Sequence, residues 1–584
     1  MRSLLKLYED LKKYWLLIVG AVALIYLQVQ ANLELPTIMS RIVNNGIIPG
    51  DINYIWQQGM LMLLISGGGI LAAISASFLT SHVSMGLGKD IRSKFFNHVE
   101  SFSLSEFNKF GASTLLTRTT NDVVQIQRST QMLIMLLSNA IFTGIDSIIL
   151  AYNASPYLTR ILYVAIPVVA LIIAILVNPI MKLFMLIQNE IDKINKVVRE
   201  NIMGVRVIRA FNKTEYEKKR RFEGANLDVT NTYIKANRII AVVMPVAMIV
   251  MNITTVAILW YGAKGIDMGN TDLGSMVAFL QYALMILMSI LMLTILFVML
   301  PRAEAAAERV VEVLETPLEI KDPEKPKQFA DNRGYVQFID VTFKYPNAEE
   351  PVLYNITFDA KPSEVIGILG TTGSGKSTLV SLIPRLYDVT SGQLLIDGMD
   401  VREVLQEELR KRISYVPQRA VIFTGTVKEN IRMGKPDATD EGIIEAAKIA
   451  QAHGFIERLS QGYDTVISEG GTNLSGGQKQ RISIARGILR RGDIFVFDDC
   501  FSALDFKTEA KLRMALKDVV KDATVILVAQ RVASVMNADK IIVLDEGRIV
   551  SIGSHKELME TSDAYREIVF SQLSQEDLVR EGLA

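Results

Sequence analysis

Hydrophobic residues in the first half of the chain gather into long runs that polar segments separate. Each run is close to the roughly 20 residues that a helix needs to cross about 30 Å of hydrocarbon, so the pattern predicts membrane-spanning helices. Buried helices of a soluble protein are the disfavoured alternative, because six runs of this length stand in one half of the chain. The predicted spans are residues 15–37, 60–80, 132–151, 157–176, 239–261 and 276–300.

Basic residues between the runs predict which way the spans point, since Lys and Arg beside a span tend to remain in the cytoplasm. They are frequent before the first run, between the second and third, and between the fourth and fifth. The alternate loops carry few of them, with Arg160 and Lys264 among those few. We therefore expect the N-terminus and the two long intervening segments on the cytoplasmic side.

The two long segments between spans are predicted to be helices that extend beyond the bilayer. Residues 190–222 mix apolar and charged positions at roughly helical spacing. We expect each segment to reverse at a short element, near residues 113–121 in the first and 211–217 in the second. A charged helix face that is merely solvated is the alternative.

Two features inside the spans are candidates for a ligand path. Asp146 interrupts an apolar run, and an ionisable group in a bilayer marks a functional site unless it lies at the interface. The last run is rich in methionine, whose flexible thioether suits a surface that repacks around varied apolar ligands; ordinary helix packing is the alternative. These methionines are Met276, Met285, Met288, Met292 and Met299.

From about residue 302 the pattern changes to a helix over residues 303–315, a linker with proline and charges over 317–332, and short apolar strands that begin near Tyr335. Such strands alternate with helical stretches, which predicts a parallel sheet covered by helices. One strand runs into GTTGSGKST at residues 370–378, the pattern of a phosphate-binding loop. Another, IFVFDD at 494–499, ends in acids.

The loop pattern assigns chemistry to particular side chains and so predicts ATP and Mg²⁺ as cofactors. Backbone N–H groups around Gly370 and Gly375 would wrap a phosphate chain, Lys376 would neutralise its charge, and Ser377 would hold Mg²⁺. Asp498 is expected to reach the metal, because ligands bind at the carboxyl ends of parallel strands. The residues assigned to ATP are Gly370, Thr371, Thr372, Gly373, Ser374, Gly375, Lys376, Ser377 and Thr378.

The amino-acid composition excludes some classes of protein and favours a membrane protein. Lys plus Arg number 62 and Asp plus Glu number 62, so no net positive charge recruits nucleic acid, which we exclude as a partner. The mean hydropathy of +0.27 is high for a wholly soluble protein. The single cysteine, Cys500, cannot form an intrachain disulfide and has no neighbouring ligands for zinc.

The segment LSGGQ at residues 474–478 is the most specific signal in the chain. With the phosphate-binding loop it resembles an ATP-binding cassette (ABC) domain, and with the spans ahead of it the chain resembles an ABC exporter half-transporter. Gln418 of YVPQ and SALD at 502–505 match two further family segments, and Tyr345 suits the aromatic residue that stacks on adenine.

The resemblance implies a fold: a membrane α-helical bundle of six transmembrane helices with long cytoplasmic extensions, followed by an α/β P-loop cassette domain. The expected division is residues 1–310 for the membrane domain, 311–334 for a linker and 335–584 for the cassette. The cytoplasmic segments would dock on the cassettes and transmit their closure to the spans. The expected location is a bacterial inner membrane, with the N-terminus and the cassette in the cytoplasm.

The resemblance also implies how nucleotide is held. Two cassettes of this family close head to tail. Each ATP then lies between the phosphate-binding loop (P-loop, residues 370–378) of one chain and the LSGGQ segment of the other, which is the family's signature segment. The metal ligands would be Ser377, Gln418 and Asp498. The residues that act on the partner's ATP would be Ser475, Gly476, Gly477 and Gln478.

Two residues depart from the family pattern at the catalytic step. Asp499 stands where the family has a glutamate that positions the attacking water, and Gln530 stands where it has the switch histidine. Aspartate is one methylene shorter, and a misplacement of about 1 Å can cost roughly a hundredfold in rate. A neutral amide cannot carry the charge of an imidazolium. Both departures predict impaired hydrolysis.

This combination resembles the non-consensus subunit of a bacterial heterodimeric multidrug ABC exporter. The partner would then be a second half-transporter that supplies the glutamate and histidine, and the cargo an amphipathic or lipophilic small molecule. A homodimeric lipid or peptide exporter and a nucleotide-regulated membrane gate are the alternatives.

Overall fold

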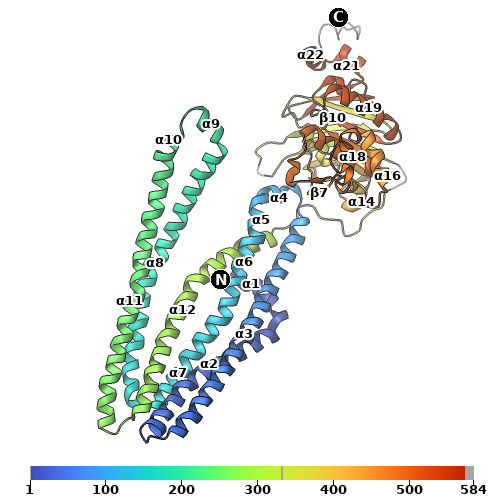
Figure 1. The fold of residues 1–584 in the computed structure, drawn as a ribbon. Helices are drawn as coiled ribbons and strands as arrows, with labels where there is room; N and C mark the ends of the chain where they lie inside the picture. Colours follow the sequence, from blue (N-terminus) through green and yellow to red (C-terminus); the bar gives the residue numbers. More distant parts are fainter. Residues whose placement is uncertain (1, 330–332, 347, 573–584) are drawn as a thin grey trace. The chain divides into compact units, whose positions relative to one another are not determined.

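The computed structural model describes residues 2–329, 333–346 and 348–572. These residues form two compact units. The first unit comprises residues 1–100 and 112–316, and the second comprises 101–111 together with 317–584. Figure 1 shows long helices in the first unit and mixed helices and strands in the second.

The first unit is a bundle of long helices. Within it α2 packs on α3, α8 packs on α11, and α12 packs on α7 and α2. Short 3-10 or π turns continue the helices at residues 9–14, 43–47, 118–122, 133–137 and 217–222. The helices are α1 (Arg2–Tyr8), α2 (Trp15–Ile42), α3 (Ile52–Glu100), α5 (Ala112–Thr117), α6 (Val123–Met132), α7 (Ser138–Ala154), α8 (Pro156–Met203), α9 (Val205–Ala210), α10 (Thr214–Tyr216), α11 (Glu223–Asp267) and α12 (Leu273–Leu314).

Five helical stretches of this unit are long and apolar enough to cross a membrane. They contain five of the six predicted spans. The remaining predicted span falls in α8, whose described apolar stretch is the shorter Pro156–Ile172. Length and composition therefore support five spans, and the sixth stays a prediction. The five stretches are Arg2–Ile47, Ile52–Glu100, Ala112–Ala154, Thr214–Asp267 and Leu273–Leu314.

Apolar side chains cover the outside of this bundle as well as its centre. At the centre, the Tyr282 hydroxyl shares a hydrogen bond of 2.7 Å with Thr37 and donates one of 3.2 Å to the Leu33 carbonyl. On the outside, Leu64 and Phe78 are 72% and 70% exposed. Contiguous apolar surface on this scale is disfavoured in water and suits a lipid environment.

An ion pair and a helix cap hold the end of α12 that follows the last predicted span. Arg309 donates to Asp122 through two nitrogens, at 2.8 and 2.5 Å. The Glu304 carboxylate accepts the backbone N–H groups of Ser3 and Leu4 at 3.0 and 3.1 Å, so it caps the start of α1. These contacts join segments that lie far apart in the sequence.

The reversal in the first long segment between spans lies earlier than the sequence predicts. The short helix α4 (Leu104–Phe110) forms this reversal, whereas residues 113–121 are already helical. Ser103 starts α4, because its hydroxyl accepts the N–H of Ser105 while Glu106 accepts the N–H of Ser103 at 2.8 Å. The prediction at 113–121 was therefore wrong. The second reversal, at residues 211–213 between α9 and α10, lies where it was predicted.

The second unit is built on a six-stranded sheet in the order β12-β11-β3-β10-β9-β6. The pairs from β11 to β6 are parallel and only β12 is antiparallel, which confirms the predicted parallel sheet. An antiparallel sheet of order β2-β1-β4-β5 accompanies it. The strands of the second unit are β1 (Val336–Phe343), β2 (Leu353–Ala360), β3 (Val365–Gly370), β4 (Ser391–Ile396), β5 (Met399–Asp400), β6 (Ile413–Val416), β7 (Gly425–Thr426), β8 (Val466–Ile467), β9 (Ile494–Asp498), β10 (Thr524–Val528), β11 (Lys540–Asp545) and β12 (Arg548–Gly553).

Alternate residues of the central strands enter two separate cores. In β9, Phe495 and Phe497 join one core, and Ile494 and Val496 join the other. This two-sided burial explains why the strand is an unbroken apolar run. The helices of the second unit after α4 are α13 (Lys376–Leu382), α14 (Gln406–Lys411), α15 (Val427–Arg432), α16 (Asp440–Ile449), α17 (His453–Ile456), α18 (Gly476–Arg490), α19 (Phe506–Val519), α20 (Val532–Val535), α21 (His555–Thr561) and α22 (Asp563–Gln572).

Candidate nucleotide-binding site

The phosphate-binding loop connects β3 to α13, as the sequence predicts. Gly375 has a φ of 97°, a backbone conformation that favours glycine, and it precedes the first residue of the helix. A Cβ on Gly370 would collide with the backbone oxygen of Leu544. Glycine is thus required at both ends of the loop for steric reasons.

Lys376 lies buried at the start of α13, and its side chain folds back to bond the phosphate-binding loop. Its ammonium donates to the carbonyl oxygens of Gly370 at 2.9 Å and Thr371 at 2.6 Å. Burial lowers the pKa of Lys376, while the charges of Asp499 and Asp498 oppose that shift. The side chain is positioned to place positive charge beside a phosphate group.

Ser377 and Asp498 form the pair that suits a metal ion. The Ser377 hydroxyl donates to Asp498 Oδ1 at 2.8 Å, and the Tyr415 hydroxyl lies 3.4 Å from Oδ2. Hydroxyl and carboxylate oxygens are ligands that Mg²⁺ prefers. No group of three or more His, Cys, Asp or Glu that could hold a metal occurs in the described part of the chain. Bound Mg²⁺ would therefore depend on this pair, on the predicted ligand Gln418 in the same cavity, and on phosphate oxygens.

Asp499 is held by two amides. Its Oδ2 accepts a hydrogen bond from Gln418 Nε2 at 3.0 Å and another from Gln530 Nε2 at 2.7 Å. Burial raises the pKa of Asp499, although these two hydrogen bonds oppose the shift. Its backbone has a φ of 43°, which aspartate tolerates better than most residues. The two non-consensus residues are thus in direct contact.

A cavity of about 220 Å³ brings most of the predicted site together. Two lining residues, Val352 and Val528, were not predicted; Val528 ends β10, where the position of ligands in parallel sheets could have indicated it. Tyr345 shares a hydrogen bond of 2.9 Å with Thr378, whereas Gly370, Thr371 and Ser374 belong to the loop without lining the cavity. The predicted residues in its wall are Thr372, Gly373, Gly375, Lys376, Ser377, Thr378, Gln418, Asp499 and Gln530.

The signature segment lies elsewhere in the cassette, at the start of α18. Ser475 caps this helix in a reciprocal pair with Gln478, whose side-chain oxygen accepts the Ser475 N–H at 2.8 Å. Among the residues that line the described cavity, none belongs to the signature. Ser475, Gly476, Gly477 and Gln478 are therefore separate from this chain's own P-loop pocket.

The end of α22 contacts residues 530–532, which we call the switch segment because Gln530 stands at the position of the family's switch histidine. Sequence reasoning missed this contact. The side chain of Gln572 accepts the N–H of Val532 at 2.8 Å and donates to the carbonyl oxygen of Gln530 at 2.9 Å. No local sequence pattern could reveal this contact, because about 40 residues separate the partners.

The reversal α4 packs on the cassette within the second unit. The buried Glu106 accepts the N–H of Glu319 at 2.5 Å. Asn108 donates to the Tyr387 hydroxyl at 3.3 Å, and the Tyr387 ring contacts Tyr345 edge to face at 5.3 Å. A short series of contacts therefore leads from α4 to Tyr345 beside the P-loop.

Comparison with known proteins supports both halves of this architecture. Residues 17–291 match the ABC transporter transmembrane region, and residues 353–502 match the ABC transporter family of ATP-binding domains. This chain belongs to the ABC transporter family. As an ABC exporter half-transporter, it carries one membrane region and one ATPase domain, and proteins of this kind act as dimers in the membrane.

Several relatives resemble this ABC transporter along most of its length. An uncharacterized ABC transporter ATP-binding protein of Mycobacterium tuberculosis is 42% identical over 97% of both chains. YfiB, an uncharacterized ABC transporter ATP-binding protein of Bacillus subtilis, is 38% identical over 98% of this chain and 99% of its own. The ATP-dependent lipid A-core flippase of Hahella chejuensis is 33% identical over 87% of this chain and 86% of its own.

Proposed function

We propose that this chain is one subunit of a heterodimeric, ATP-driven exporter and that its own P-loop forms a slow ATP site. The observation that carries the proposal is the contact of Asp499 with Gln418 and Gln530. Both amides use the same carboxylate oxygen, Oδ2, so a water molecule could bond to that oxygen only in competition with them. An acid that is one methylene short and has one oxygen already occupied by two amides is poorly placed to orient the attacking water.

The signature residues Ser475, Gly476, Gly477 and Gln478 would complete a fast site on the partner's P-loop. Their separation from this chain's own cavity supports that assignment. Tyr345 would stack on adenine, while Ser377, Gln418 and Asp498 would surround Mg²⁺. The second half-transporter would supply the catalytic glutamate and the switch histidine.

The proposed topology has six spans, with the N-terminus and the cassette in the cytoplasm of a bacterial inner membrane. The chain would divide into a membrane domain (1–310), a linker (311–334) and the cassette (335–584). The helix α8 would supply the fourth span. The basic segments between alternate spans support this orientation.

The cargo would be an amphipathic small molecule. A cavity of about 250 Å³ among α2, α7 and α12 supports this class, since Asn139 and Thr143 face it beside Met285, Met288 and Met292. Hydrogen-bonding groups and adaptable thioethers would together accept a ligand of mixed polarity. Asp146 accepts a hydrogen bond from Gln30 at 2.5 Å, which gives its carboxylate a protein partner inside the bundle.

A lipid exporter, homodimeric or heterodimeric, is the second candidate. It is favoured by the relatives named ATP-dependent lipid A-core flippase, which are 32–33% identical to this chain. Uphill transport of a lipophilic dye, compared with outward movement of a labelled lipid in the same vesicles, distinguishes these cargoes. A nucleotide-regulated gate would move neither against a gradient.

ATPase activity of the purified chain alone in lipid nanodiscs tests the slow site. Lys376→Ala provides the background, and nucleotide binding measured in parallel confirms that the cassette is folded. We expect binding with turnover near that background. Brisk turnover that disappears in Lys376→Ala would show that Asp499 suffices and would refute the heterodimer proposal.

A further inference from the structure

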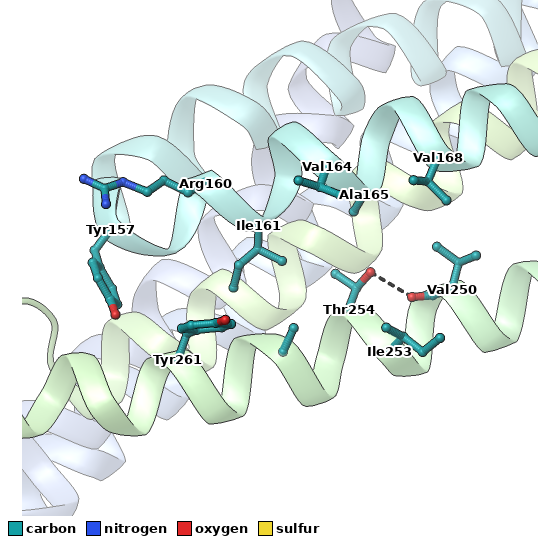
Figure 2. A pocket seen from close by; sticks show the side chains of 11 residues that line it. Tyr157, Arg160, Ile161, Val164, Ala165, Val168, Val250, Ile253, Thr254 and Tyr261 are labelled. Carbon is teal, nitrogen blue, oxygen red and sulfur yellow. Dashed lines mark hydrogen bonds between the residues drawn. The ribbon is translucent and has the colours of Figure 1, made fainter.

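A cavity of about 480 Å³ lies between α8 and α11, outside the nucleotide site (Figure 2). Most of its wall is aliphatic, with Val164 and Val168 on α8 and Val250 and Ile253 on α11. Thr254 adds little polarity, because its hydroxyl donates to the Val250 carbonyl at 2.7 Å. The volume falls within the range of small-molecule sites, and the wall suits a hydrocarbon chain.

One end of the cavity is polar. Tyr157, Arg160 and Tyr261 gather there, while Val168 and Val250 lie toward the other end (Figure 2). The Arg160 guanidinium lies 5.9 Å from the centre of the Tyr157 ring, and among the described residues no carboxylate pairs with it. The cavity thus offers an unneutralised cation at the end of an apolar groove.

The position of Arg160 in the predicted topology is unusual. It is one of the few basic residues beside the loops that we expect on the outer side of the membrane, where Lys and Arg are disfavoured. A cation at the end of a span is costly unless an anion or water accompanies it. A ligand with negative charge would account for both its presence and its lack of a protein partner.

We infer that this cavity binds a membrane phospholipid with an anionic headgroup, one acyl chain lying along the aliphatic wall and the phosphate meeting Arg160. The tyrosine hydroxyls at the same end suit the boundary between headgroup and hydrocarbon. The inference is independent of which subunit hydrolyses ATP.

Native mass spectrometry of the full chain tests this site. The chain is released from nanodiscs that contain equal amounts of phosphatidylglycerol and phosphatidylcholine, and the retained lipids are counted. We expect one phosphatidylglycerol retained in preference to phosphatidylcholine. Arg160→Gln should reduce that preference about tenfold, as expected for loss of charge-assisted hydrogen bonds to a phosphate. Val164→Trp, which fills the groove, should reduce retention of both lipids.

Lys264→Gln is the matched control. It removes the same charge near the end of α11, but Lys264 faces the Trp260 ring at 5.2 Å and does not line the described cavity. Equal loss of phosphatidylglycerol in Lys264→Gln and Arg160→Gln would overturn the proposal, because general surface charge would then explain binding. Undiminished lipid in Val164→Trp, with weakened association between two copies, would assign the cavity to a subunit interface and would also overturn it.

Discussion

At the scale of single residues, Asp499 and Gln530 form one hydrogen-bonded pair rather than two unrelated departures. The sequence predicted that both residues would weaken hydrolysis. Because they are in direct contact, we expect that the family's glutamate and histidine must be introduced together to restore activity. A longer acid alone would still meet the amide of Gln530. A histidine alone would still leave the acid about one methylene short.

We expect Asp499→Glu with Gln530→His to raise the ATPase rate of the purified chain by about 100-fold or more, because a well-placed general base contributes roughly 10²- to 10⁴-fold. Initial rates in nanodiscs provide the measurement. The same double variant carrying Lys376→Ala should show no gain. A double variant no faster than the parent would mean that residues other than this pair limit turnover.

The P-loop, LSGGQ and the two departures could be predicted because each lies in a short stretch with its own chemical pattern. Tyr415 beside Asp498 and Gln572 beside the switch could not, since their partners lie 83 and 40 residues away. Those contacts arise only after the strands have been ordered into a sheet. Local spacing carries no information about that order.

At the scale of elements, a buried carboxylate is one of the contacts that join α4 to the rest of the second unit. Burial by itself would raise the pKa of Glu106, but hydrogen bonds from the Ser103 side chain and the Glu319 backbone outweigh it and lower the pKa. Because the folded pKa lies below the ordinary value of 4.5 for glutamate, the stabilisation is complete above that pH. It is lost as the pH falls through the folded pKa.

Glu106→Gln should therefore lower the free energy of unfolding by about 1–3 kcal/mol at neutral pH, the typical value for hydrogen bonds to a charged group. The difference from the parent should stay constant above about pH 5 and shrink in more acidic buffer. Thermal unfolding across pH measures both effects. Glu557→Gln, in the exposed capping box of α21, is the control and should change stability less. A difference independent of pH would contradict this account.

A second prediction for an element concerns the ion pair of Arg309 and Asp122, which holds the end of α12. Arg309→Ala leaves the buried Asp122 carboxylate without its guanidinium partner, so we expect a loss of about 1–3 kcal/mol. Asp122→Asn should cost less, since its amide oxygen can still accept from Arg309. Thermal unfolding of both single variants and the double variant measures the coupling. Strictly additive losses would show that the pair contributes nothing.

The position of α4 shows where helix prediction from sequence failed. Charged and apolar residues alternate helically on both sides of residue 103, so periodicity alone gave no reason to end a helix there. The Ser103 and Glu106 spacing of a capping box was visible, but it decides a helix start only where the chain can reverse. Packing against the cassette supplies that condition, through Glu319 and Tyr387.

At the scale of the whole molecule, the proposed pair of half-transporters should respond unequally to damage in this chain. Lys376→Ala disables the slow site, so we expect most transport to remain. Ser475→Arg obstructs the donors that complete the partner's fast site, so we expect transport and ATPase activity to fall near background. Transport by the reconstituted pair in vesicles measures both variants. Equal losses in the two variants would indicate two equivalent sites.

The contact of Gln572 with Gln530 and Val532 makes the end of α22 a remote reporter on the nucleotide site. The Val532 amide hydrogen is protected by that one side chain, so its exchange with deuterium should accelerate in Gln572→Ala while neighbouring strand amides stay protected. A proteolytic cut that removes α22 would remove this contact, and we expect it to alter the segment around Gln530. Preparations that have lost α22 should not be assumed to share the turnover rate of the full chain.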